Sequence, residues 1–211
     1  MAKAVVFDCD GVLVDSEELA WDAWRHVLGN YGIELEASEI AELTGRTEQD
    51  AYGYFAARGE LPPYDDFWPE LAQAVTARFE AHLLAFQDAE STLAELRELG
   101  MPFAVASSSP RERLDMALSR TGLDRLVEVT IAGDEVGKGK PSPDLYLAAA
   151  QALDVDPSDC VAVEDTPAGI EAARAAGMTV VAVPRGRYET TELGEADRIV
   201  ERLQAGILVG G

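Results

Sequence analysis

The stretch VVFDCDGVLVDS at residues 5–16 begins as an apolar strand and ends in two acidic residues, Asp8 and Asp10. Residues i and i+2 of a strand point to the same side. Two unit charges about 4 Å apart repel each other by about 4 kcal/mol at an effective dielectric constant near 20. A buried strand with this ending therefore predicts a bound cation, or two acids that take different chemical roles.

Apolar runs alternate with amphipathic helical stretches along most of the remaining chain, which is typical of an α/β fold. The strand candidates are apolar throughout, as expected for a Rossmann-like parallel sheet with helices on both faces. We expect strands at residues 4–8, 103–107, 128–132, 160–164 and 179–183, an edge strand at 197–200, and helices at 88–99, 110–121, 143–153 and 166–176.

One long segment after the first strand contains helical patterns alone, at residues 17–30, 47–58 and 67–84. An all-helical block inserted there predicts a separate cap domain over the sheet. We therefore expect an α/β core formed by residues 1–15 and 86–211, and a helical cap formed by residues 16–85.

The charge of the chain limits its partners. The 211 residues include 17 basic and 39 acidic side chains, for a net charge of −22, which repels nucleic acids and anionic membranes. No apolar run approaches the roughly 20 residues of a membrane helix, and the N-terminus lacks a signal-peptide pattern. With Cys9 and Cys160 read as reduced core thiols, we expect a cytoplasmic protein. Separately, we expect it to be a monomer.

Polar residues follow several of the predicted strands, and ligands of open α/β sheets bind at the carboxyl ends of the strands. Besides Asp8 and Asp10, the acidic pair Glu164 and Asp165 ends the fourth strand. Carboxylates cannot share a partly buried site without a cation, and oxygen ligands beside a phosphate favour Mg²⁺. The sequence thus predicts a magnesium site at this edge.

The same edge carries candidate phosphate ligands. In SSSPRE, Ser109 is expected to cap a helix that begins at Pro110, and a helix N-terminus is an anion site. The Ser107 hydroxyl and the next backbone N–H are placed to hold a phosphate oxygen. Lys140, in a loop stiffened by prolines, can neutralise a phosphoryl oxygen, and Thr166 is expected to cap a second helix.

Four motifs in this order, DCDGVLVDS, VASSS, KPSPD and VEDTPAGIEAARAAG, resemble those of the haloacid dehalogenase superfamily of phosphohydrolases. The resemblance covers nearly the whole chain outside the helical block. It points to the branch that contains β-phosphoglucomutases and small-molecule phosphatases with a helical cap after the first strand.

The resemblance implies a role for each matching residue. Asp8 would be the nucleophile that forms an aspartyl-phosphate. Asp10 would protonate the leaving group, then activate water, and would offer its backbone carbonyl to Mg²⁺. Ser107 and the Ser108 backbone N–H would bind phosphate, and Lys140 would balance charge.

The implied metal site consists of acidic residues from the first and fourth strands. Asp165 would bind Mg²⁺ directly, whereas Glu164 would stand beside it or one layer further out. The full implied ligand set is Asp8, Asp10, Glu164 and Asp165.

The helical block departs from the mutases that the chain resembles. Their cap histidine is replaced by Ala20 and their cap arginine by Glu48. A mutase must hold both ends of a bisphosphate, so these differences favour a phosphatase. Arg46 is a candidate substrate contact or a plain surface arginine, and Glu17 is expected to face the entrance.

We therefore expect a Mg²⁺-dependent phosphatase that hydrolyses a small phosphorylated metabolite, such as a sugar phosphate, through an aspartyl-phosphate. The main alternative is a phosphomutase of the β-phosphoglucomutase type. A non-catalytic phospho-acceptor like a signalling receiver is disfavoured by the inserted helices. A haloacid dehalogenase proper would need neither Asp10 nor a metal.

Overall fold

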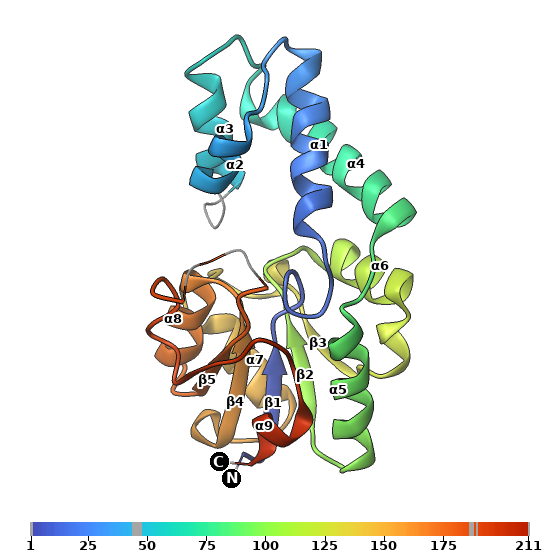
Figure 1. The fold of residues 1–211 in the computed structure, drawn as a ribbon, viewed down its shortest axis with the longest axis vertical. Coiled ribbons are helices and arrows are strands. Elements are labelled where there is room, and N and C mark those ends of the chain that lie inside the picture. The colour runs from blue at the N-terminus through green and yellow to red at the C-terminus, as the bar shows by residue number, and fades with distance from the viewer. Residues whose placement is uncertain (1, 44–47, 186–187, 189, 211) are drawn as a thin grey trace. The chain divides into compact units, whose positions relative to one another are not determined.

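The structure, a computed structural model, describes residues 2–43, 48–185, 188 and 190–210. The chain divides into two compact units, one α/β and one helical (Figure 1). Met1–Asp15 and Leu84–Gly211 form the α/β unit, and Ser16–Leu83 form the helical unit. No described helix combines the length and apolar character that a membrane crossing requires.

The α/β unit is built on a six-stranded parallel sheet with the strand order β3-β2-β1-β4-β5-β6. The first strand of the sequence therefore lies in the middle, where Phe7 pairs with Val105 on one side and Val163 on the other. The strands are β1 (Ala4–Phe7), β2 (Phe103–Ala106), β3 (Val129–Ile131), β4 (Cys160–Glu164), β5 (Thr179–Ala182) and β6 (Arg198–Ile199).

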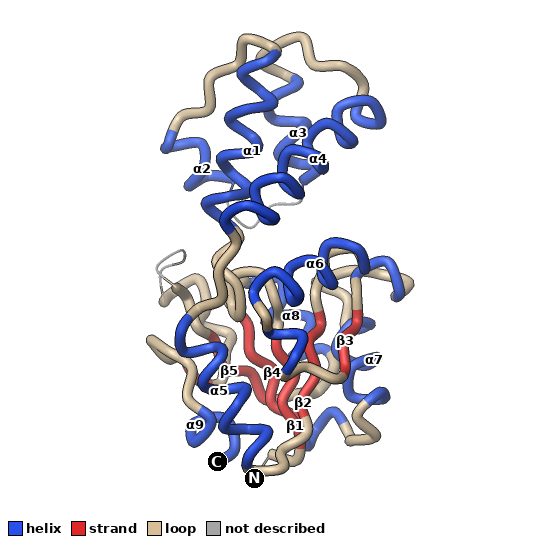
Figure 2. Tube along the Cα trace, turned by 90° about the vertical axis from the view of Figure 1, so that its right-hand side faces the viewer, coloured by secondary structure: helices blue, strands red, loops and turns tan. Residues whose placement is uncertain are grey.

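Helices cover both faces of this sheet. Alternate residues of β1 point to opposite faces, and Ala4 and Val6 belong to a buried cluster that includes residues of α7 and α8. Figure 2 shows α5 and α9 on one side of the strands and α7 on the other. The arrangement confirms the predicted Rossmann-like α/β fold. The helices of this unit are α5 (Gln87–Glu98), α6 (Arg111–Thr121), α7 (Asp144–Ala152), α8 (Pro167–Ala175) and α9 (Ala205–Val209).

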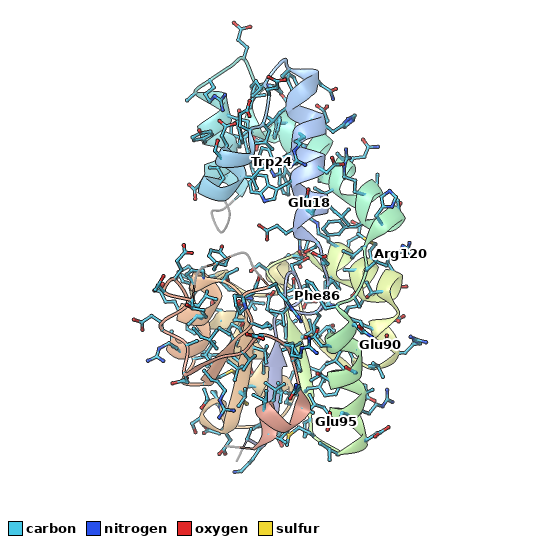
Figure 3. All side chains as sticks on the ribbon, in the orientation of Figure 1. Glu18, Trp24, Phe86, Glu90, Glu95 and Arg120 are labelled. Atoms are coloured by element: carbon cyan, nitrogen blue, oxygen red, sulfur yellow. The ribbon has the colours of Figure 1, made fainter. Side chains whose placement is uncertain are left out.

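The helical unit has its own aromatic core. Trp24 packs within it (Figure 3), with ring centroids 5.9 Å from Phe55 and 5.6 Å from Phe67. All three side chains are buried, so the unit stabilises itself through apolar burial. Its helices are α1 (Glu17–Asn30), α2 (Ala37–Leu43), α3 (Glu48–Ala56) and α4 (Tyr64–His82); α2 was not among the predicted helices.

One predicted helix start is wrong. Ser109 does not cap α6, because the helix begins one residue later than expected and Pro110 takes the cap position without a side-chain bond. The first helical amide, that of Arg111, is instead satisfied by the Asp134 carboxylate at 2.9 Å. Thr166 does cap α8, where its hydroxyl accepts a hydrogen bond from Gly169 N at 3.1 Å.

Candidate active site

The loop after β1 carries the two predicted aspartates. Asp8 continues the strand, since its amide donates to Val163 O at 2.9 Å. The chain then turns back through Gly11, whose φ of 84° lies in the region that favours glycine. The amides of Leu13 and Val14 both donate to Cys9 O and close the turn. This tight loop fixes where Asp10 can point.

Asp10 meets the serines that follow β2. Its Oδ2 accepts hydrogen bonds from Ser107 Oγ at 3.3 Å and from Ser109 Oγ at 3.0 Å. Ser107 is fully buried, and its hydroxyl also accepts from Ser109 N at 3.0 Å. Ser109 therefore serves this edge of the sheet and not the helix cap. Ser108 is exposed next to it.

Lys140 joins the ends of β1 and β4. Its ammonium contacts Asp8 Oδ1 as a buried ion pair and donates to Glu164 Oε1 at 2.6 Å. The side chain is 8% exposed. Although burial disfavours the charged form, the carboxylates of Asp8 and Glu164 raise the Lys140 pKa well above its usual value. Lys140 is thus a fixed positive charge at the carboxyl edge of the sheet.

Glu164 is saturated with hydrogen-bond donors. Oε1 accepts from Lys140 and from Tyr146 OH, each at 2.6 Å. Oε2 accepts from Asp165 N, Thr166 N and Thr166 Oγ1 at 3.0 to 3.2 Å. Burial acts to raise the Glu164 pKa, but Lys140 and these donors hold that pKa below its usual value. With both oxygens engaged, Glu164 is better suited to orient Lys140 than to bind a metal.

Gly169 makes this arrangement of Glu164 possible. A Cβ atom at position 169 would lie 1.8 Å from Glu164 Oε1, so any larger residue in the first turn of α8 would displace the carboxylate. The N-terminus of α8 can approach the acid this closely because residue 169 has no side chain. Glu164 thereby sits against the positive end of the helix.

A cluster of buried acids marks a possible metal site. Asp8, Glu164 and Asp165 each offer an oxygen, and these oxygens lie within 4.8 Å of one another. Burial, opposed by the Lys140 ammonium and aided by Glu164 and Asp10, raises the pKa of Asp8 to about 7. Carboxylate oxygens are the donors that Mg²⁺ prefers, and a divalent cation relieves their mutual repulsion. Asp8 and Asp165 therefore fit Mg²⁺ as oxygen donors, whereas both oxygens of Glu164 are already hydrogen-bonded.

Comparison with known proteins identifies the family. The model of the haloacid dehalogenase-like hydrolase family matches residues 5–183. The chain belongs to this family. It is therefore a hydrolase, and the resemblance seen in its four sequence motifs is confirmed.

Relatives of this haloacid dehalogenase-like hydrolase include two proteins named as phosphatases. Validoxylamine A 7'-phosphate phosphatase of Streptomyces hygroscopicus subsp. limoneus is 32% identical over 203 residues, covering 96% of this chain and 95% of the relative. Fructose-1-phosphate phosphatase YqaB of Escherichia coli (strain K12) is 33% identical over 181 residues, covering 85% of this chain and 95% of the relative. The likeness thus extends over nearly the full length of both relatives.

A solved structure gives the same match in three dimensions. A HAD family hydrolase from Deinococcus radiodurans R1, crystallised with bound phosphate and sodium, is 36% identical. The two structures superpose with a TM-score of 0.77 over 94% of this chain and 90% of that one.

Two predicted contacts of this hydrolase lie in the helical segment. Glu17 is at the start of α1, where its Oε1 accepts a hydrogen bond from Trp21 Nε1 at 3.3 Å. Arg46 lies outside the described residues.

Tyr146 and Gly169 are site residues that the sequence analysis missed. Tyr146 lies on the apolar face of a predicted helix, where an aromatic side chain reads as core. Gly169 had a weak signal, because a glycine inside a helical pattern often has a packing reason.

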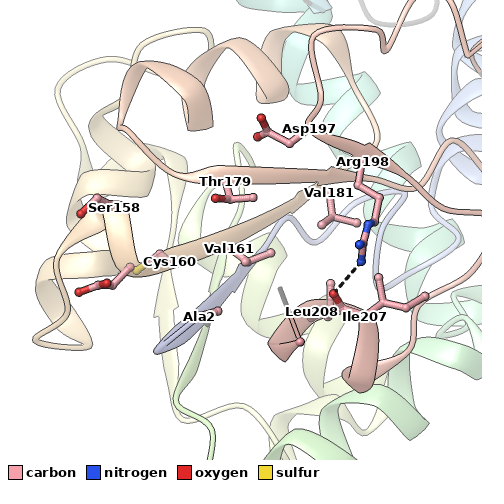
Figure 4. Close-up of a pocket in the computed structure, with 12 residues that line it drawn as sticks. Ala2, Ser158, Cys160, Val161, Thr179, Val181, Asp197, Arg198, Ile207 and Leu208 are labelled. Carbon is pink, nitrogen blue, oxygen red and sulfur yellow. Dashed lines mark hydrogen bonds between the residues drawn. The ribbon is translucent and has the colours of Figure 1, made fainter.

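A pocket lies at the opposite edge of the sheet, where β4 and β5 begin (Figure 4). It has a volume of about 390 Å³ and is lined by residues that include Cys160, Thr179 and Arg198. The acids of the β1 and β4 ends, Ser107 and Lys140 are absent from its described lining. The groups that fit the hydrolase chemistry are therefore at the carboxyl edge.

Proposed function

We propose that this hydrolase is a Mg²⁺-dependent phosphatase that acts on a small phosphorylated metabolite through an aspartyl-phosphate. The observation that carries the proposal is the buried contact between Asp8 and Lys140, beside Glu164 and Asp165. A carboxylate held against a fixed cation can attack phosphorus, because the cation offsets the repulsion between the carboxylate and the phosphoryl oxygens.

In the first proposed step, an Asp8 carboxylate oxygen attacks phosphorus and forms an acyl-phosphate bond. The bond from phosphorus to the leaving oxygen breaks, and Asp10 gives its proton to that oxygen. In the second step, Asp10 takes a proton from a water whose oxygen attacks phosphorus. The acyl-phosphate bond breaks, inorganic phosphate leaves and the Asp8 carboxylate is restored.

Ser107, the Ser108 backbone N–H and Lys140 are proposed to hold the phosphoryl oxygens. The buried hydroxyl of Ser107 already lies in hydrogen-bond reach of Asp10, at 3.3 Å, so phosphate held by Ser107 would also meet the proposed acid and base. Lys140 would keep its charge throughout, because Glu164 remains paired with it.

Asp8, Asp165 and the Asp10 backbone carbonyl are the proposed magnesium ligands. Glu164 is left out of the direct ligand set, because five hydrogen bonds engage its two oxygens. When bound, Mg²⁺ supplies positive charge that neutralises the phosphoryl group.

The substrate class is supported by the relatives and by the helical segment. Two relatives are named as phosphatases of fructose 1-phosphate and of validoxylamine A 7'-phosphate, and Ala20 and Glu48 replace groups expected in a mutase. We therefore favour a sugar phosphate or a similar metabolite over a phosphomutase substrate. Residues 16–85, with Glu17 and Arg46 as candidate contacts, are proposed to act as the selecting cap of a cytoplasmic monomer.

The covalent mechanism is tested by Asp8→Asn. We expect the purified chain with Mg²⁺ to hydrolyse p-nitrophenyl phosphate, and Asp8→Asn to lower kcat by about 10³-fold or more, because the nucleophile is lost. The control is Asp124→Asn, which makes the same change at an exposed position and should keep full activity. Both variants should retain the circular dichroism spectrum of the wild type. Turnover by Asp8→Asn at the wild-type rate would remove Asp8 as the nucleophile.

A further inference from the structure

Arg185 connects the end of β5 to the loop that carries Asp10. Its Nη1 and Nη2 donate to the two carboxylate oxygens of Asp88, each at 2.8 Å. Nη2 also donates to the backbone carbonyl of Val12 at 3.0 Å, and Val12 is two residues beyond Asp10. A planar guanidinium can make both contacts at once, since its N–H groups form a rigid fork.

The surroundings hold Arg185 in one conformation. Its side chain is 10% exposed, and its guanidinium carbon lies 4.0 Å from the ring centroid of Phe86. Figure 3 shows Phe86 at the start of α5. The Arg185 backbone has a φ of 51°, which is disfavoured for residues other than glycine and persists where the structure around it requires it.

The contacts of Arg185 with Val12 and Phe86 lie beside the two segments that link the α/β unit to the helical unit. The segment that leads into that unit and the segment that returns from it pair as a short antiparallel ribbon. Phe86 N donates to Leu13 O at 2.9 Å, and Asp15 N donates to Leu84 O at 3.0 Å. Arg185 contacts both sides of this ribbon: it donates to the carbonyl of Val12, the residue just before one segment, and lies against the ring of Phe86 in the other.

Asp88 links Arg185 to the C-terminal part of the α/β unit. In addition to the Arg185 fork, Asp88 Oδ2 accepts a hydrogen bond from the backbone amide of Leu203 at 2.8 Å. Four separate segments of the chain therefore meet at one partly buried ion pair. The contact to Val12 is the one that reaches the loop of the candidate active site.

We propose that Arg185 is a positioning residue that holds the Asp8–Val14 loop so that the Asp10 carboxylate faces Ser107 and Ser109. The inference rests on the proposed function, because Asp10 matters only if it transfers protons. Arg185 acts through the Val12 carbonyl, and its described hydrogen bonds go to Val12 and Asp88, neither of which is a proposed metal ligand. Its removal should let the loop move and should misplace Asp10.

The effect should appear in the second chemical step. p-Nitrophenolate is a good leaving group that departs without a proton, so transfer of the phosphoryl group to Asp8 should stay fast in an Arg185 variant. Hydrolysis of the aspartyl-phosphate needs Asp10 as the base, and a misplacement of about 1 Å costs on the order of 10²-fold. We therefore expect a burst of p-nitrophenolate followed by slow turnover.

The experiment compares Arg185→Met and Arg185→Lys with a matched control, Arg174→Met. Arg174 is in the same unit and also pairs with carboxylates, those of Glu195 and Asp197, but it is 45% exposed and contacts neither the loop nor Asp88. Arg185→Lys keeps the charge and loses the rigid fork of N–H groups. It provides a second variant to measure if Arg185→Met does not fold. Each protein is assayed by stopped-flow kinetics with p-nitrophenyl phosphate and by hydrogen exchange of peptides that cover residues 8–16.

We expect Arg185→Met to lower kcat by about 10²-fold and KM by a similar factor, because only the second step is slowed, so that kcat/KM stays near the wild-type value. The substitution should also speed exchange in residues 8–16. Arg185→Lys should fall between Arg185→Met and the wild type, and Arg174→Met should match the wild type. Wild-type kcat in Arg185→Met, or in Arg185→Lys if Arg185→Met does not fold, would overturn the inference. If the wild type itself fails to hydrolyse p-nitrophenyl phosphate, the proposed function fails instead, and unchanged exchange would separately refute the anchoring of the loop.

Discussion

Glu164 shows how one buried residue organises the carboxyl edge of the sheet. Its carboxylate is fully buried, yet both oxygens are paired with donors from Lys140, Tyr146 and the two residues that precede α8, Asp165 and Thr166. A buried charge without such partners would cost several kcal/mol. The sequence placed this acid at the end of a strand, but its hydrogen-bond partners depend on how close α8 can come.

Gly169 sets that distance, which gives a prediction at the residue scale. Gly169→Ala should lower the free energy of unfolding by about 1–3 kcal/mol or more, because the new Cβ would lie 1.8 Å from Glu164 Oε1 and must displace it. It should also reduce activity by turning Lys140 away from Asp8. Urea denaturation and kcat with p-nitrophenyl phosphate measure the two effects.

Gly206→Ala is the matched control for Gly169→Ala. Gly206 is likewise near the start of a helix of the same unit, and a Cβ there would meet nothing within 4 Å. Helix propensity alone should make Gly206→Ala neutral or more stable by up to about 1 kcal/mol. Equal effects of the two substitutions would show that α8 and Glu164 do not need the close approach.

At the scale of elements, the periodic parts of the chain could be predicted and the irregular parts could not. The five main strands and the four helices between them lie within one residue of the predicted bounds, because burial on both faces leaves continuous apolar runs. The start of α6 could not be predicted. Ser109 has the features of an N-cap, but it bonds Asp10, which is 99 residues away in the sequence.

The residues of the candidate site likewise divide into those that the sequence could predict and those that it could not. The sequence alone predicted that Asp8, Ser107 and Asp165, at strand ends, and Lys140, in a loop, would lie at one edge of the sheet. The roles of Tyr146 and Arg185 arise from contacts between segments that are distant along the chain, and no local pattern signals such contacts. Gly169 acts on the nearby Glu164, and a glycine inside a helical pattern is only a weak signal of such a role.

The first turn of α5 supplies a pH-dependent prediction at this scale. Burial acts to raise the pKa of Asp88, but hydrogen bonds from Arg185 and Leu203 N outweigh it and lower that pKa below its usual value. A lowered folded-state pKa means that Asp88 stabilises the fold above the unfolded value, about 3.9, and that this contribution is lost as the pH falls through the folded value.

Asp88→Asn should therefore lower the free energy of unfolding by about 1–3 kcal/mol at pH 7. The difference from the wild type should persist at pH 5 and shrink as the pH falls below about 4. Urea denaturation across this range measures it, with Asp124→Asn as the exposed control. A difference that grows as the pH falls would contradict the assignment.

The whole molecule carries a net charge of −22, and its buried acids add local repulsion that a bound cation can relieve. After removal of divalent ions with EDTA, Mg²⁺ at about 100 times its Kd should stabilise the chain by about 2.7 kcal/mol. For a protein of this length that corresponds to a rise in Tm of roughly 5–10 °C. Differential scanning calorimetry measures the rise.

Asp165→Asn should abolish most of this magnesium-dependent rise, whereas Asp124→Asn should leave it intact. The readout needs no substrate, so it tests the metal site separately from the hydrolysis. A full rise in Tm in Asp165→Asn would place the stabilising cation elsewhere on this acidic surface.

The antiparallel ribbon of residues 13–15 and 84–86 has an evolutionary consequence. Because Asp15 N and Leu84 O are hydrogen-bonded at 3.0 Å, the inserted segment departs from and rejoins the sheet at a single point. A different folded module with neighbouring termini could be transplanted at that point, and the strand register would stay as it is. Lineages could thus acquire new substrates by exchanging the insert while inheriting the hydrolytic residues unchanged.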